Sequence, residues 1–173
     1  MKNEKEKIQD FTRVAREYCQ IIDALDQKEV GQGLNILAHT LPTLYLMALD
    51  LPQGDTVSEE GFETIVSHEE WQAIFLKLQG YFGEKDLYFH VFNPIDLTDD
   101  RPVAGSLSDD LSDIYRDLKE GIVRLGKASE GDIVWHWKFN FSIHWGTHLV
   151  TAMHVIHCLL FKGDIKTNDE DKK

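Results

Sequence analysis

Cysteine is scarce in this sequence, and long apolar runs are absent. The two cysteines, Cys19 and Cys158, lie far apart among apolar neighbours, which is typical of buried, reduced thiols and not of a disulfide framework. No apolar run approaches the roughly 20 residues needed to span a bilayer. The segment from Met1 to Arg13 is charged, unlike a secretory signal. We therefore expect a cytoplasmic protein that neither crosses nor binds a membrane.

Basic residues are also in short supply. The chain has 18 Lys and Arg against 30 Asp and Glu, for a formal net charge of -12. Because a polyanion repels nucleic acid and anionic lipid surfaces, both are disfavoured as partners. If the protein has a macromolecular partner, the charge favours a basic protein.

Several catalytic motifs are missing as well. The sequence has no Gly-rich phosphate loop, no Gly-x-Ser-x-Gly elbow, no Cys-x-x-Cys pair and no EF-hand pattern. One hypothesis is therefore a non-enzymatic helical module, without a cofactor, that interacts with or regulates another protein. The large aromatic side chains of the C-terminal third would suit such a contact, including one between two copies of the chain.

Helical periodicity is what the sequence does contain. A chain of 173 residues can bury one continuous core, and apolar residues recur every three or four positions in five segments. This pattern predicts an all-α, single-domain bundle of about five main helices over residues 1–163, with a disordered charged tail at 164–173. The expected helices cover residues 8–25, 30–51, 68–82, 107–125 and 133–162.

Capping residues and proline refine these boundaries. Ser67 and Glu70 form a Ser-x-x-Glu capping box that predicts a helix start, and Ser106 resembles a second cap. Asp132 is expected to cap the last helix. Pro42 lies inside the second helix, where it removes a backbone donor and predicts a kink or a break.

The last helix and the segment before the fourth helix have the least regular patterns. Residues 133–162 are apolar or aromatic on every side, which predicts the most buried helix of the bundle, with a possible break near residues 138–142. Residues 84–105 lack a clear period and are expected to lie across one end of the bundle. Such a long connection either packs its aromatics over the core or binds a ligand.

Histidines are concentrated in the C-terminal segment, which holds five of the eight: His136, His144, His148, His154 and His157. His144 and His148 are four residues apart, so both imidazoles leave one face of a helix and could share a metal ion. His154 and Cys158 have the same spacing. They are consistent with a nucleophile pair, but a buried thiol beside a core histidine is the simpler interpretation.

The fourth helix offers carboxylates to complete a metal site. Asp110, Asp113 and Asp117 repeat at three and four residues, and in a bundle they could face His144 and His148 of a neighbouring helix. The alternative is an ordinary solvated face with acidic residues favoured by the helix dipole. The second hypothesis is accordingly a metal-binding protein or metal-dependent enzyme that holds a divalent transition metal.

Two motifs resemble an uncharacterised bacterial domain-of-unknown-function family of short, acidic, helical proteins. The first is Pro-Val-Ala-Gly-Ser-Leu-Ser-Asp-Asp-Leu-Ser-Asp-Ile-Tyr-Arg-Asp-Leu-Lys-Glu-Gly at residues 102–121. The second is His-Trp-Gly-Thr-His at residues 144–148, followed by Ala152 and Ile156-His157. The resemblance covers most of the chain and implies a helical, cytoplasmic protein, but no activity.

Overall fold

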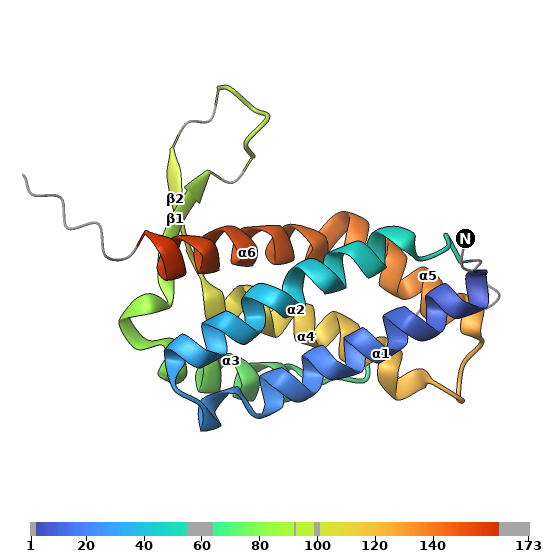
Figure 1. The fold of residues 1–173 in the computed structure, drawn as a ribbon. Coiled ribbons are helices and arrows are strands. Elements are labelled where there is room, and N and C mark those ends of the chain that lie inside the picture. The colour runs from blue at the N-terminus through green and yellow to red at the C-terminus, as the bar shows by residue number, and fades with distance from the viewer. Residues whose placement is uncertain (1–2, 55–63, 92, 99–100, 163–173) are drawn as a thin grey trace, which may run out of the picture.

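Long helices and one short hairpin make up the computed structural model, which describes residues 3–54, 64–91, 93–98 and 101–162. The predicted helical single domain is confirmed, with the hairpin added to it (Figure 1). Residues 164–173, expected to be a disordered tail, lie outside the described residues. The helices are α1 (Glu4–Asp23), α2 (Val30–Asp50), α3 (His68–Phe82), α4 (Leu107–Arg124), α5 (Glu130–Asn140) and α6 (Gly146–Phe161), and the strands are β1 (Leu87–Val91) and β2 (Pro102–Ser106).

A single π turn, Phe141–Trp145, joins α5 to α6. The two therefore form one helical segment, the fifth of the predicted bundle. The expected break near residues 138–142 was wrong, because α5 runs to Asn140 and continues directly into the π turn. The start of the segment was predicted too late. Ser129, not Asp132, is the N-cap, and its hydroxyl accepts a hydrogen bond from the Asp132 backbone N–H at 3.1 Å. A Ser-x-x-Asp cap thus sets the start.

The other caps are as predicted. The Ser67 hydroxyl and the Glu70 carboxylate each accept a hydrogen bond from the other residue's backbone N–H, which starts α3, and Ser106 caps α4. A break at Pro42 was wrong, because α2 continues through it. Leu41 and Leu44 on either side of the proline are fully buried, so packing against the core keeps both halves of the helix formed despite the lost backbone bond.

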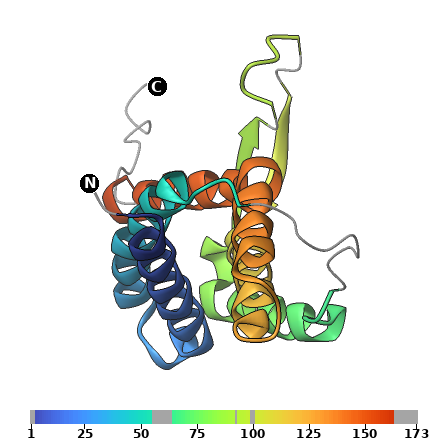
Figure 2. The same ribbon diagram turned by 90° about the vertical axis from the view of Figure 1, so that its right-hand side faces the viewer.

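The centre of the bundle is α4, not the C-terminal helix. It packs against α1, α3, α5 and α6, and is surrounded by them (Figures 1 and 2). By contrast, α6 contacts mainly α2 and α4 and buries a single stripe, including Leu149, Ala152 and Ile156. Its outer side remains exposed, with Phe161 at 71%. The apolar residues all round α6 therefore reflect exposed apolar positions and not full burial.

The central position of α4 depends on small residues and tryptophans. Trp137 of α5 and Trp145 are fully buried against Phe11 of α1. The Trp137 indole N–H donates to the Leu118 carbonyl at 3.1 Å, directly over Gly121, where any Cβ would collide with the indole. Close contact between α4 and α5 thus requires glycine at this position.

Residues 84–105 were predicted to be an irregular connection across one end of the bundle. This was wrong for β1 and β2, which pair as an antiparallel hairpin. Leu87 pairs with Ser106 and Val91 with Pro102. The hairpin rises from the bundle beside α6 (Figure 1). Its period of two was hidden because Leu87, Phe89 and Val91 are apolar yet exposed, while the alternate positions Tyr88 and His90 are also aromatic and face the bundle.

Candidate metal centre

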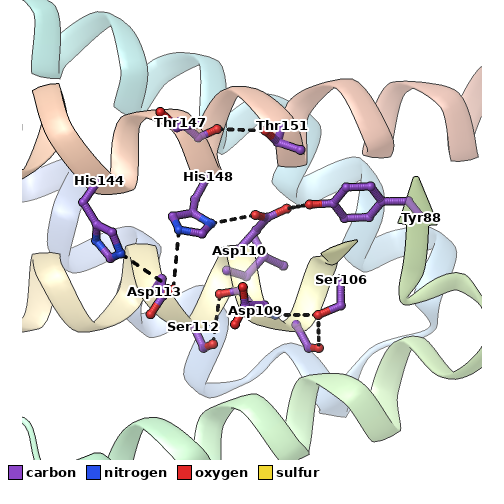
Figure 3. A network of polar contacts seen from close by, with 12 residues as sticks. Tyr88, Ser106, Asp109, Asp110, Ser112, Asp113, His144, Thr147, His148 and Thr151 are labelled. Atoms are coloured by element: carbon purple, nitrogen blue, oxygen red, sulfur yellow. Dashed lines mark hydrogen bonds and ion pairs between the residues drawn. The ribbon is translucent and has the colours of Figure 1, made fainter. Parts of the chain in front are cut away.

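Five polar side chains that the sequence nominates meet between α4 and the start of α6. Figure 3 shows Asp110, Asp113, His144 and His148 among them. Asp110, Asp113 and Asp117 lie on one face of α4, with exposures of only 3%, 8% and 8%. His144 in the π turn and His148 in the first turn of α6 lie opposite them, partly exposed. The structure therefore brings all five predicted residues into one cluster.

Each histidine contacts two aspartates, one through each ring nitrogen. His144 Nδ1 lies 2.7 Å from Asp117 Oδ2, and its Nε2 lies 3.9 Å from Asp113 Oδ2. His148 Nδ1 lies 2.8 Å from Asp110 Oδ1, and its Nε2 lies 3.5 Å from the same Asp113 oxygen. Because a carboxylate can only accept, each Nδ1 donates to its aspartate, and each Nε2 faces Asp113.

Asp113, His144 and His148 each offer one ligand atom, and these three atoms lie within 4.8 Å of one another. These three form the inner group, while Asp110 and Asp117 stand behind the histidines. The sequence treated the three aspartates as equivalent, and the geometry separates one of them from the other two. Among the described residues, no other group of His, Cys, Asp or Glu has this compactness.

The π turn sets the position of His144. The π turn widens the helix by one residue. The imidazole rings of His144 and His148 then lie edge to face, with their centroids 5.0 Å apart. Gly146 permits this turn, because a Cβ there would collide with the Phe141 carbonyl oxygen. Isolated π turns occur frequently at functional sites, and the Gly inside His-Trp-Gly-Thr-His is the sequence signal for this one.

Arg116 holds the second oxygen of Asp113, with Nη2 2.8 Å from Oδ1. Its guanidinium also lies over the Trp71 ring, 5.7 Å from the centroid. The Asp113 oxygen that faces the histidines is therefore fixed in orientation. Sequence reasoning did not identify Arg116, although its spacing of three from Asp113 on one helix allows this pair.

Tyr88 is a further site residue that the sequence did not reveal. Its hydroxyl donates to Asp110 Oδ2 at 2.6 Å, so a hairpin side chain supports the carboxylate behind His148 (Figure 3). Gly105 pairs with Tyr88 across the hairpin, and a Cβ at Gly105 would lie 2.7 Å from the phenol. Glycine here lets the tyrosine ring cross β2 and reach α4.

The cluster concentrates negative charge in a partly buried space. Burial raises the pKa of Asp110 above its usual range, although hydrogen bonds from His148 and Tyr88 act in the opposite direction. Burial and the neighbouring Asp113 raise the pKa of Asp109. Burial alone would lower the pKa of His148, but the hydrogen bond to Asp110 and the surrounding carboxylates raise it. The raised pKa of His148 shows that the surrounding carboxylates favour a positive charge at this position.

The remaining C-terminal histidines stay outside this inner group. His136 is buried, with Nε2 3.3 Å from the Asp117 carbonyl and Nδ1 3.1 Å from the Asn140 amide, so both of its nitrogens are engaged. Burial lowers the pKa of His136. His154 and His157 are exposed on α6, and Cys158 is half-buried. The structure shows no bond between His154 and Cys158.

Comparisons with known proteins agree with the resemblance seen in the sequence. A solved structure, protein BF1032 from Bacteroides fragilis, is similar over 96% of each chain, with 26% identity and a TM-score of 0.76. No curated protein matches the chain. Among the described residues, no helix has the length and apolarity to cross a bilayer. A family model with the description "Domain of unknown function (DUF5063)" matches residues 2–162, and the chain therefore belongs to the DUF5063 family.

Proposed function

We propose that this protein is a cytoplasmic metal-binding protein that holds a divalent transition metal through Asp113, His144 and His148. One observation carries the proposal: each histidine donates its Nδ1 proton to a separate carboxylate, and both Nε2 atoms face a third. Histidines that ligate metals almost always donate their other ring N–H to a carboxylate, carbonyl or water, which fixes the tautomer and raises the basicity of the ligand.

The distances suit a metal ion after a small adjustment. Ligand atoms bound at about 2.1 Å in a tetrahedral site lie roughly 3.4 Å apart, and the two Nε2 atoms lie 3.5 and 3.9 Å from Asp113 Oδ2. Two imidazoles and one carboxylate suit zinc, iron, manganese or nickel better than calcium or magnesium. Three protein ligands leave at least one coordination position for water or another ligand.

Ordinary ion pairing accounts less well for this arrangement. A structural histidine is satisfied by one carboxylate, and Asp110 and Asp117 already serve His148 and His144. Asp113 is then a third carboxylate, which lies between the two rings and is also paired with Arg116. A bound cation gives this buried negative charge its counterpart.

Metal content and uptake test the proposal. We expect protein purified without chelator to contain a transition metal, or to take up about one equivalent on titration with zinc. The double variant His144→Ala/His148→Ala should lose this metal and keep its helicity. The matched control His154→Ala/His157→Ala removes two exposed histidines from the same helix and should bind normally. Equal uptake by the two double variants, or none by the wild type, would overturn the proposal.

An interaction module remains the second candidate function, and the hairpin supports it. Leu87 and Phe89 are 72% and 79% exposed, and Ile95 and Leu97 beyond β1 are 87% and 92% exposed. Exposed apolar side chains grouped on one projection are typical of a protein contact. The partner would be a basic protein or a second copy of the chain. Light scattering tests the second copy: a strict monomer at high concentration would exclude it.

A further inference from the structure

A cleft between the hairpin and α6 opens onto both histidines of the candidate metal centre. It has a volume of about 690 Å³ and is lined by His144 and His148 together with side chains of the hairpin and α6. A smaller cleft of about 400 Å³ on the other side is lined by His144 but not by His148. A molecule that reaches an open coordination position between the two imidazoles is therefore best accommodated in the hairpin cleft.

The described walls of the hairpin cleft combine apolar side chains with hydroxyl groups and carry no lysine or arginine. Val103 and Ile143 supply apolar surface, and Thr147, Thr151 and Tyr88 supply hydroxyl groups. Among the described residues, the lining contains no Lys or Arg, and His90 is its one further titratable base. Asp109 and Asp110, in contrast, contribute carboxylates to the same lining.

The surroundings of the candidate metal centre remain negatively charged when a divalent metal is bound. The four carboxylates of Asp109, Asp110, Asp113 and Asp117 outweigh one divalent ion and the Arg116 guanidinium by one negative charge. The chain as a whole is also acidic, with a formal net charge of -12. An anion that entered the cleft would meet like charge from its walls and find no arginine or lysine there to bind it.

We propose that the hairpin cleft admits an uncharged or cationic organic molecule with a nitrogen or oxygen donor, which binds the metal between His144 and His148. This inference rests on the proposed metal site. The apolar body of such a ligand would lie against Val103 and Ile143, and Thr147 and Thr151 would accept or donate hydrogen bonds. Such a molecule would fill the cleft, whereas the negative charge of the walls would exclude compact anions such as phosphate.

Cobalt-loaded protein provides the test, because the visible absorption of Co²⁺ changes when its coordination changes. Imidazole, which is uncharged at about pH 8, and azide, a compact anion, serve as the two probes. We expect imidazole to alter the cobalt bands at a concentration at least about tenfold lower than azide, since one unit of like charge at this range is worth about that factor.

Two pairs of variants locate the ligand. Thr151→Trp fills the hairpin cleft and should weaken imidazole binding at least about tenfold, whereas Thr64→Trp, in the smaller cleft, should not. Val103→Lys adds a cation beside the site and should strengthen azide binding severalfold relative to the neutral Val103→Gln. All four variants should still take up cobalt, because none of the changed residues is a proposed ligand.

The possible failures separate the two proposals. Wild-type protein that takes up no cobalt would overturn the metal site and the inference together. Cobalt uptake with bands that imidazole leaves unchanged, or that azide changes at the same concentration, would overturn only the inference. Equal imidazole binding by Thr151→Trp and Thr64→Trp would also overturn it, because the ligand would then not occupy the hairpin cleft.

Discussion

The Tyr88 hydroxyl donates a 2.6 Å hydrogen bond to Asp110, and this bond connects the hairpin to the helix that carries the candidate metal centre. Asp110 in turn accepts from His148 Nδ1 at 2.8 Å. A hairpin side chain thus orients a proposed metal ligand through one intervening carboxylate, so the hairpin is part of the site and not only a projection from the bundle.

Removal of the Tyr88 hydroxyl should therefore weaken metal binding. Partners beyond the ligands of a metal typically contribute 10–100-fold in affinity, and Tyr88 acts one step further away. We expect Tyr88→Phe to raise the zinc Kd about three- to tenfold in a competition titration. Tyr81→Phe removes a comparable hydroxyl that donates to the Glu29 carbonyl and should leave the Kd unchanged. The same Kd for both variants would contradict the role of Tyr88.

Replacement of the aspartates should distinguish the ligand from its supports. Asp113→Asn removes the proposed carboxylate ligand, and uptake of zinc should be lost. Asp110→Asn and Asp117→Asn keep an acceptor oxygen for the histidine N–H, so the Kd should rise only about 10–100-fold. Isothermal titration calorimetry measures all three. If Asp110→Asn or Asp117→Asn abolished binding while Asp113→Asn had little effect, the assignment of ligand and supports would be wrong.

Gly146→Ala should destabilise the metal-free protein by about 1–3 kcal/mol, because the added Cβ overlaps the Phe141 carbonyl inside the π turn. Gly80→Ala is the matched control: it lies in α3, and a Cβ there meets nothing within 4 Å. That substitution should stabilise the protein by about 0.5–1 kcal/mol through helix propensity. Urea unfolding measures both. Stabilisation by both alanines would show that the π turn does not require glycine.

The two cysteines should differ in reactivity toward a thiol reagent. Cys19 is 4% exposed, and burial raises its pKa to about 12. Only about one Cys19 in 10,000 would be a thiolate at pH 8, and the thiolate is the reactive form. Cys158 is half-buried on α6. We expect one rapidly reacting thiol in the native protein, absent in Cys158→Ser, and a second only after unfolding. Rapid labelling of native Cys158→Ser at Cys19 would contradict the packing of α1.

Sequence patterns predict the helices well, because their signals are local. The stripes of α1 and α4 and the capping box at Ser67 depend on residues a few positions apart. Burial of whole helices is a different matter. The C-terminal helix is apolar all round, but which helix occupies the centre depends on how many neighbours surround it, and that is a property of the packed bundle.

The candidate site was predictable in part for the same reason. Spacing alone placed His144 with His148 and aligned the aspartates on α4. It could not say that Asp113 faces both imidazoles while Asp110 and Asp117 support them, because this depends on the relative rotation of two helices. Tyr88 lies 22 residues from Asp110, and only the pairing of Tyr88 with Gly105 in the hairpin brings the two together.

X-ray absorption spectroscopy of the zinc-loaded protein tests the central claim most directly, since it reports the number and kind of ligands around the metal. The account predicts two imidazole nitrogens and lighter oxygen ligands at about 2.0–2.2 Å, and no sulfur. In His148→Ala, one imidazole should be lost from any metal that remains bound. Protein that retains no zinc after dialysis, or a zinc site with fewer than two imidazoles or with sulfur ligands, would contradict it.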